Sequence, residues 1–185
     1  MAEAYGKLMG KPGICFVTRG PGATNASVGV HTAFQDSTPM ILFIGQVARD
    51  QVEREAFQEI DYRRMFGQMA KWVVAVDDAA RLPELLSQAF HRATNGRPGP
   101  VVVALPEDML TDLVDVADAG PAQSIEPAAS PAALEQLQSL IGQAQRPLVV
   151  LGGGGWSAEA VSDIREFIEK QNLPVAASFR CQDLF

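Results

Sequence analysis

The sequence predicts an α/β fold built on a parallel β-sheet. Five short apolar runs are rich in β-branched residues and are continuous rather than alternating, which is typical of strands covered on both faces. Segments whose apolar residues have helical spacing lie between these runs. Because strand and helix alternate in this way, we expect a three-layer arrangement with helices on both sides of the sheet.

The expected elements follow one another along the chain. Strands are expected at residues 14–18, 40–44, 72–76, 101–105 and 148–151, with a weaker one at 174–177. Helices are expected at residues 2–9, 23–33, 82–90, 134–141 and 161–168. Capping residues support the last three of these helices. Asp77 or Asp78 can begin the helix at 82–90, and Asn95-Gly96 can end it. Ser130 with Pro131 can begin the helix at 134–141, and Ser157 can begin the one at 161–168.

Residues 111–130 form a clear break in composition. They contain no aromatic residue, two prolines, many alanines and several acids, which is typical of an interdomain linker. We therefore expect one domain at 1–110 and the start of a second, Rossmann-like α/β domain at 131–185. No strand precedes the first helix, and about 55 residues are too few to cover both faces of a second sheet. We expect two partial domains, with apolar surface left exposed in the isolated chain.

Composition excludes several classes of function. The chain has 185 residues and a formal net charge of -7, which argues against a nucleic-acid partner held by phosphate contacts. No apolar run reaches the ~20 residues that cross a bilayer, and no secretory signal is present. Cys15 and Cys181 form no CxxC pair. His31 and His91 have no Cys, Asp or Glu at metal spacing, so we expect no metal site in the chain. The missing apolar run predicts no membrane partner, and the two isolated cysteines fit a reducing, cytoplasmic location.

Four segments could carry chemistry, each with a structural alternative. Gly20-Pro21-Gly22 leads from a strand into a helix, where free N–H groups suit an anion or a polar heterocycle; a tight turn explains it equally well. It is neither a Walker loop nor a GxGxxG motif, since Asn25 occupies the third glycine position. The glycine run Gly152–Gly155 at a second strand–helix junction fits a nucleotide or, again, a tight turn.

The other two segments follow the expected strand at 40–44. Gly45–Arg49 lies at its carboxyl end, where ligands bind in open α/β sheets, although Arg49 is also explained as a solvated loop arginine. Ala56–Asp61, with Lys71 soon after, could line a pocket between Phe57 and Ile60. The alternative for this segment is a short helix that packs one aromatic side chain.

The order of these motifs resembles the thiamine diphosphate-dependent enzymes, and most closely the acetolactate synthase large subunit. The motifs are Gly20-Pro21-Gly22-Ala23-Thr24-Asn25, Asp36-Ser37-Thr38-Pro39, Gly45-Gln46-Val47, Ala56-Phe57-Gln58-Glu59, Lys71, Gly96-Arg97-Pro98-Gly99-Pro100-Val101, Arg146-Pro147 and Gly152–Gly155. Their joint order makes chance an improbable explanation. Ala48 stands where acetolactate synthases commonly have proline, which leaves related decarboxylases and carboligases open.

The resemblance implies that 1–110 is the later part of a pyrimidine-binding domain and that 131–185 opens a central domain. It places the glutamate that activates the cofactor upstream of Met1 and the magnesium- and diphosphate-binding motif downstream of Phe185. We therefore expect a fragment of a longer enzyme that is inactive by itself.

The resemblance also assigns roles to residues of this chain. Pro21, Gly22 and Asn25 would border the aminopyrimidine ring, while Phe57 and Gln58 would face the reacting centre. The remaining assignments are Lys71 near the substrate or cofactor channel, Gln46 at the mouth of the site, and Gly152, Gly153 and Gly154 beside FAD, a cofactor that only some relatives carry.

The implied activity is decarboxylation of a 2-keto acid such as pyruvate and transfer of the two-carbon unit to a second keto acid. The implied cofactors are thiamine diphosphate and Mg²⁺, with FAD left open, and the implied setting is a homodimer or tetramer in branched-chain amino acid biosynthesis. Two alternatives remain: a catalytically inactive fragment or pseudoenzyme, and a plain nucleotide-binding module that uses Gly152–Gly155.

Overall fold

A computed structural model describes residues 1–125 and 127–185, which form two compact units, 1–125 and 126–185. The first unit contains a four-stranded sheet of β1 (Gly13–Val17), β2 (Met40–Gln46), β3 (Trp72–Ala75) and β4 (Pro100–Pro106). Its spatial order is β1-β2-β4-β3, and every neighbouring pair is parallel. The sheet is therefore open, with β1 at one edge and β3 at the other.

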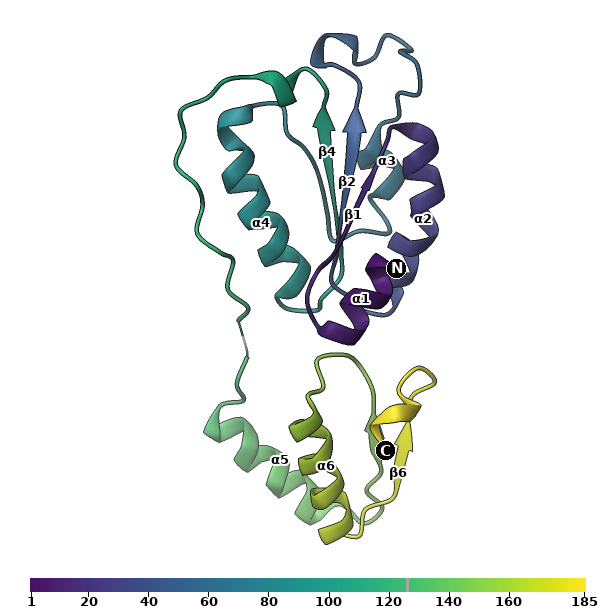
Figure 1. Ribbon diagram of the computed structural model, residues 1–185. Helices are drawn as coiled ribbons and strands as arrows, with labels where there is room; N and C mark the ends of the chain where they lie inside the picture. The colour runs from purple at the N-terminus through teal and green to yellow at the C-terminus, as the bar shows by residue number, and fades with distance from the viewer. Residues whose placement is uncertain (126) are drawn as a thin grey trace. The chain divides into compact units, whose positions relative to one another are not determined.

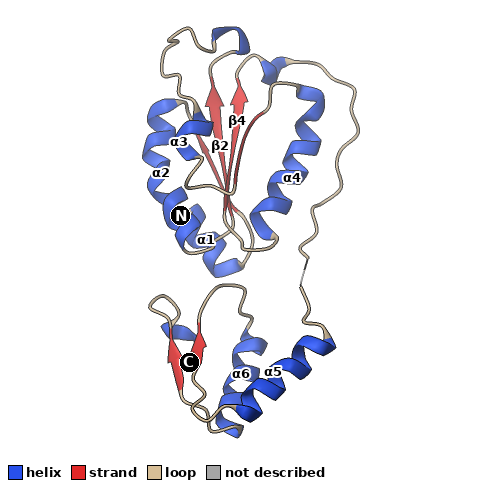
Figure 2. Cartoon of the chain, turned by 180° about the vertical axis from the view of Figure 1, so that it is seen from behind, coloured by secondary structure: helices blue, strands red, loops and turns tan. Residues whose placement is uncertain are grey.

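Helices cover the two faces of this sheet (Figures 1 and 2). One face carries α1 (Ala2–Met9), α2 (Gly20–Gln35) and α3 (Tyr62–Phe66), and the other carries α4 (Leu82–Thr94). Parallel strands need crossover connections, which these helices provide. The result confirms the three-layer α/β fold that the sequence predicts.

A separate hydrophobic core fills each side of the sheet. Side chains of α2 and α3 pack with Leu42, Ile44 and Val102 on one side. Side chains of α4 pack with Ile41, Phe43 and further residues of β3 and β4 on the other. Because alternate residues of β2 point to opposite cores and almost all of them are buried, the strand shows a continuous apolar run instead of an alternating pattern.

Most element boundaries agree with the sequence prediction to within a few residues. Asp78 caps a short 3₁₀ turn (Ala79–Arg81) that leads into α4, and Asn95 ends α4 as expected. The short helix considered for 56–61 is misplaced: α3 begins at Tyr62, where the Asp61 side chain accepts a hydrogen bond from the Arg64 N–H. Further 3₁₀ turns lie at Arg49–Gln51, Met109–Thr111 and Gln182–Leu184.

The second unit is small and mostly exposed. It contains α5 (Pro131–Gln143), β5 (Val149–Leu151), α6 (Ala158–Lys170) and β6 (Val175–Ala177), and its two strands pair in parallel. Ser130 and Ser157 cap their helices, as the sequence predicts. The core is limited to a few residues around Leu151 and Ile168. No residue of α5 is buried, and the leucines of its apolar stripe remain more than half exposed.

Residues 112–125, which belong to the expected linker, form neither helix nor strand. Among the described residues, no helix has both the length and the apolar character needed to cross a membrane.

Gly13 allows α1 to lie directly over β1, because a Cβ atom at this position would stand 1.8 Å from the Ala2 carbonyl oxygen. We expect Gly13→Ala to lower the free energy of unfolding by about 1–3 kcal/mol, the usual cost of overpacking. Gly29 in α2 is the matched control, since its added Cβ would meet nothing within 4 Å.

Gly29→Ala should leave stability unchanged or raise it by about 0.5–1 kcal/mol through helix propensity. Urea denaturation of both variants and the parent chain measures the difference. Equal midpoints for Gly13→Ala and the parent would contradict the described packing of α1.

Candidate functional site

The candidate site lies at the carboxyl edge of the first sheet, beside the start of α2. An open pocket of about 450 Å³ is present there. It is lined by Gly20, Pro21, Thr24, Asn25, Gln58, Glu59 and Ile60. The structure thus brings together Pro21, Asn25 and Gln58, which the sequence places in one site although more than 30 residues separate them. Open α/β sheets bind their ligands at this edge.

Glycines let the first turn of α2 approach its neighbours closely. The Gly20 N–H donates a hydrogen bond of 3.0 Å to the Gln58 carbonyl oxygen. A Cβ at Gly20 would stand 2.9 Å from that same oxygen, and a Cβ at Gly22 would stand 3.0 Å from the Val17 Cβ. Gly22 therefore seats the helix on β1 instead of lining the pocket. The Gly-Pro-Gly segment is both the tight turn and the wall of the pocket.

The opposite wall has an unusual backbone. Gln58 has a φ of +67°, and Glu53 and Glu55 also lie in the left-handed region, which non-glycine residues seldom adopt. The Glu59 carboxylate accepts a 2.7 Å hydrogen bond from the Glu53 N–H and one of 3.3 Å from Ala56. These bonds hold the loop, so its strained residues are kept in place next to α2.

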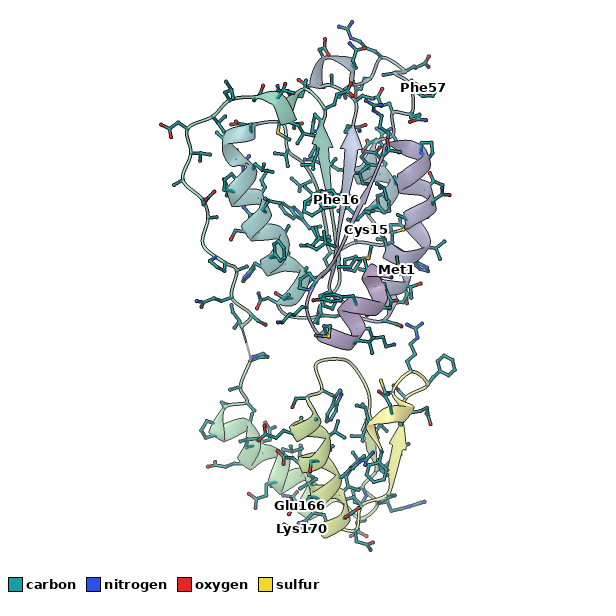
Figure 3. The ribbon with its side chains drawn as sticks, in the orientation of Figure 1. Met1, Cys15, Phe16, Phe57, Glu166 and Lys170 are labelled. Carbon is teal, nitrogen blue, oxygen red and sulfur yellow. The ribbon has the colours of Figure 1, made fainter. Side chains whose placement is uncertain are left out.

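Phe57 projects from this loop into solvent and is 80% exposed (Figure 3). Most of this aromatic side chain is therefore left uncovered by its own unit. It stands immediately before Gln58, whose side chain lines the pocket. The position is consistent with a side chain that meets a ligand or another part of the protein.

Gln46 supports the pocket without lining it. Its side-chain amide donates a 2.9 Å hydrogen bond to the Ile60 carbonyl oxygen and accepts one of 2.9 Å from the Val47 N–H. Both polar ends of the side chain are therefore used to fasten the loop to the end of β2. A direct contact between Gln46 and a cofactor would require these bonds to break.

Ion pairs hold the same edge of the sheet. Arg19, at the end of β1, pairs with Glu107, which follows β4. Arg49 donates from Nε to Asp108 at 2.7 Å and pairs through Nη2 with Asp112 at 2.9 Å. Neither arrangement was anticipated from the sequence. Arg49 is thus neither a free anion-binding group nor a merely solvated one, and the hydrogen bond from Arg49 lowers the pKa of Asp108.

Two buried polar atoms under the loop have no hydrogen-bond partner among the described residues: Arg19 Nε and the Tyr62 hydroxyl. Burial raises the pKa of Tyr62 to about 12, so the hydroxyl keeps its proton at neutral pH. Unsatisfied buried groups of this kind are commonly bridged by an ordered water molecule. The sequence offered no signal for them, because they meet only through the tertiary fold.

Lys71 is not part of this group. It precedes β3, at the amino edge of the sheet, and its ammonium donates to the Asn95 carbonyl oxygen at 2.8 Å and to that of Arg92. Burial and the neighbouring Arg92 charge lower the pKa of Lys71. The lysine binds the last carbonyl groups of α4, a helix-capping arrangement. The resemblance predicts Lys71 near the substrate or cofactor channel. In the structure its ammonium instead lies beside the end of α4, at the amino edge of the sheet.

The glycine run lies in the second unit, between β5 and α6. Gly153 and Gly155 have φ values of 80° and 85°, which glycine adopts without strain. Trp156 Nε1 donates a 3.1 Å hydrogen bond back to the Gly152 carbonyl oxygen, and Gly154 lies within the turn that this bond closes. The turn leaves Gly153, Gly154 and Gly155 exposed before the start of α6.

The residues of the first pocket fit a small polar heterocycle. The pocket offers backbone groups of a helix N-terminus and the amides of Asn25 and Gln58, with Pro21 and Ile60 as apolar walls. The described residues contain no group of three or more His, Cys, Asp or Glu side chains that could hold a metal ion.

The pairing of Arg49 with Asp108 predicts a pH dependence of stability. Because the folded pKa of Asp108 lies below its ordinary value of 3.8, the stabilising contribution is complete above that value. It is lost as the pH falls through the lowered folded pKa. We expect Asp108→Asn to be less stable than the parent near pH 6, with the gap closing toward pH 2.

Urea midpoints measured from pH 2 to 6 give both curves. Asp118→Asn, an exposed acid after β4, serves as the control and should show no gap. A difference between Asp108→Asn and the parent that stays constant across this range would contradict the ion pair.

Comparison with known proteins identifies the family. The family model described as "Thiamine pyrophosphate enzyme, N-terminal TPP binding domain" matches residues 1–65, and "Thiamine pyrophosphate enzyme, central domain" matches 134–185. Residues 66–133 lie outside both matches.

Several relatives of this chain are acetolactate synthase large subunits. An acetolactate synthase large subunit from Parasynechococcus marenigrum is 39% identical over the whole chain and 31% of its own length. That of Lactococcus lactis is 35% identical over 96% of the chain and 32% of its own length. The isozyme 2 large subunit of Escherichia coli is 34% identical over 97% of the chain and 33% of its own length. The chain thus spans about a third of the relatives it matches, and it belongs to the thiamine pyrophosphate enzyme family.

Proposed function

We propose that this chain supplies the aminopyrimidine-binding side of a thiamine diphosphate-dependent carboligase or decarboxylase that acts on 2-keto acids. The observation that carries this proposal is the pocket between the first turn of α2 and Gln58. It lies at the ligand-binding edge of a parallel sheet and is built from the segments that resemble the family. The names of the relatives favour an acetolactate synthase type of reaction.

The pocket suits an aminopyrimidine for chemical reasons. Such a ring is planar, apolar on its faces and polar at its edge, so it needs apolar walls and a few well-placed hydrogen-bonding groups. Pro21 and Ile60 provide walls, while Asn25 provides an amide with two donors and one acceptor oxygen. Thiamine diphosphate, when bound, would supply a nucleophilic carbon for the keto group and an acceptor for the electron pair that stays behind when carbon dioxide leaves.

The roles of the chain's own residues follow from their positions. We assign Asn25 to the polar edge of the ring and Gln58, with Phe57, to the reacting centre. Gln46 acts indirectly by holding the Ile60 carbonyl group and thus the loop that carries Gln58. Gly22 permits close seating of α2 on β1. Lys71 receives no role in this proposal, because it caps α4 instead.

The glycine turn of the second unit is a second ligand site to be tested. Its left-handed Gly153 and Gly155 at a strand–helix junction support close approach of a dinucleotide such as FAD. We propose the thiamine site as the main function, because the pocket of about 450 Å³ lies there.

Further proposals concern the whole protein. We propose that it works with Mg²⁺ bound by residues outside this chain, as a homodimer or tetramer in the cytoplasm, in branched-chain amino acid biosynthesis. We also propose that the 185-residue chain alone has no acetolactate-forming activity, since no carboxylate of the described residues lines the pocket except Glu59. The Glu59 side chain accepts hydrogen bonds from loop N–H groups.

The test is an NMR titration of the ¹⁵N-labelled chain with thiamine, with thiamine diphosphate plus Mg²⁺, and with FAD. We expect thiamine compounds to shift the amide signals of Gly20–Asn25 and Gln58, while those of Gly152–Gly155 stay unmoved. Asn25→Ala should weaken this binding about fivefold to tenfold, the effect of losing one or two hydrogen bonds. His31→Ala, a change of an exposed residue farther along α2, is the matched control.

The outcomes separate the two ligand sites. Shifts confined to Gly152–Gly155, and seen only with FAD, would favour the nucleotide-binding module. No shift with millimolar thiamine compounds in a folded chain would contradict the proposed pocket. Acetolactate formation from pyruvate by the chain alone would contradict the proposal that it is inactive.

A further inference from the structure

Two buried hydrogen-bonding atoms come from the two segments that flank the pocket. They are Arg19 Nε and the Tyr62 hydroxyl oxygen, and neither has a hydrogen-bond partner among the described residues. Arg19 immediately precedes Gly20 and the first turn of α2, while Tyr62 is the first residue of α3, directly after the loop that carries Gln58. Most buried polar atoms of folded proteins have at least one partner, so this pair is unusual.

Both atoms are enclosed by the first unit itself. Less than 1 Å² of either atom is accessible, and Tyr62 as a whole is 3% exposed. The Tyr62 ring belongs to the core that α2 and α3 form on one face of the sheet. A segment outside this unit cannot reach either atom unless the fold opens. The partner must therefore be small enough to fit inside the unit.

Several contacts bring the two residues into one region. The Gly20 N–H binds the Gln58 carbonyl oxygen, and a Cβ at Gly20 would stand 3.1 Å from Ile60 Cδ1. Burial raises the pKa of Tyr62 to about 12, and the Arg19 charge opposes this rise. A charge has such an effect only on a group that lies close to it. The guanidinium and the hydroxyl are therefore neighbours beneath the loop.

The chemistry of the two groups indicates what could lie between them. The Nε–H of an arginine can only donate a hydrogen bond, whereas a protonated tyrosine hydroxyl can donate one and accept one. The Arg19 charge is already paired with Glu107 through Nη2, so the site does not call for an anion. A water molecule accepts from the arginine and bonds to the hydroxyl in either direction, and it is the smallest group that satisfies both.

We propose that one ordered water molecule is bound between Arg19 Nε and the Tyr62 hydroxyl and joins the start of α2 to the start of α3 beneath the pocket. This bridge acts beside the bond from Gly20 to the Gln58 carbonyl oxygen, since both connect the same two segments. Neither Arg19 nor Tyr62 lines the pocket. The proposal is therefore independent of which ligand the pocket binds.

Tyr62→Phe tests the bridge through the sign of its effect. Removing a hydroxyl that bonds to an ordered water molecule should lower the folding equilibrium constant of the full chain about fivefold to tenfold. Removing a buried hydroxyl that has no partner should raise this constant instead. Urea denaturation at pH 7 measures the difference. Tyr5→Phe is the matched control, because Tyr5 in α1 is 49% exposed, and it should leave the constant unchanged.

A double-mutant cycle tests whether Arg19 is the other end of the bridge. Arg19→Lys keeps a positive charge near Glu107 but removes the Nε–H donor. In the Arg19→Lys background, Tyr62→Phe should change the folding equilibrium constant less than twofold, because the bridge is already broken. Circular dichroism verifies that each variant is folded. An undiminished effect of Tyr62→Phe in this background would overturn the proposal.

NMR of the unaltered chain needs no variant to fold. The Arg19 Nε–H signal, assigned through its bonds to the Arg19 backbone, should show a cross-peak with water of the sign that marks direct dipolar contact. A signal without this cross-peak would overturn the proposal, and so would a stabilising Tyr62→Phe. Failure of thiamine compounds to bind would affect neither measurement, so this proposal and the proposed function are tested separately.

Discussion

The parallel pairing of β2 with β4 determines where the functional residues of the first unit lie. Seven residue pairs, from Met40 opposite Pro100 to Gln46 opposite Pro106, form this central ladder. Because the strands run in the same direction, their carboxyl ends reach one edge of the sheet. Everything that follows a strand there, including the start of α2 and the loop that carries Gln58, is brought into one region.

The second constraint is close approach at that edge. The Gly20 N–H group binds the Gln58 carbonyl oxygen, and no side chain at Gly20 would leave room for the contact. Gln46 and Glu59 hold the same loop from two other directions. A loop with left-handed residues stays ordered only when its surroundings hold it. The pocket thus depends on a few hydrogen bonds between segments that are distant in the sequence.

The sequence predicted what local rules govern. Apolar runs located the strands, and Ser130 and Ser157 located two helix starts, because caps and strand patterns depend on neighbouring residues. The motif order also assigned Pro21, Asn25 and Gln58 to one site. The links between distant residues were missed: Arg49 binds Asp108, 59 residues away, and Gln46 binds the Ile60 carbonyl group. The resemblance placed Lys71 near the substrate or cofactor channel, whereas in the structure its ammonium binds carbonyl groups at the end of α4.

Amide hydrogen exchange at Gly20 tests the central claim most directly. The first N–H groups of a helix normally exchange quickly, because they lack partners within the helix. The structure predicts that the Gly20 amide is protected by its bond to the Gln58 carbonyl oxygen. We expect it to exchange at least about tenfold more slowly than the Gly22 amide in the same first turn of α2. Exchange of Gly20 at the rate of an unstructured loop would contradict the account, because the two walls of the pocket would then not be joined.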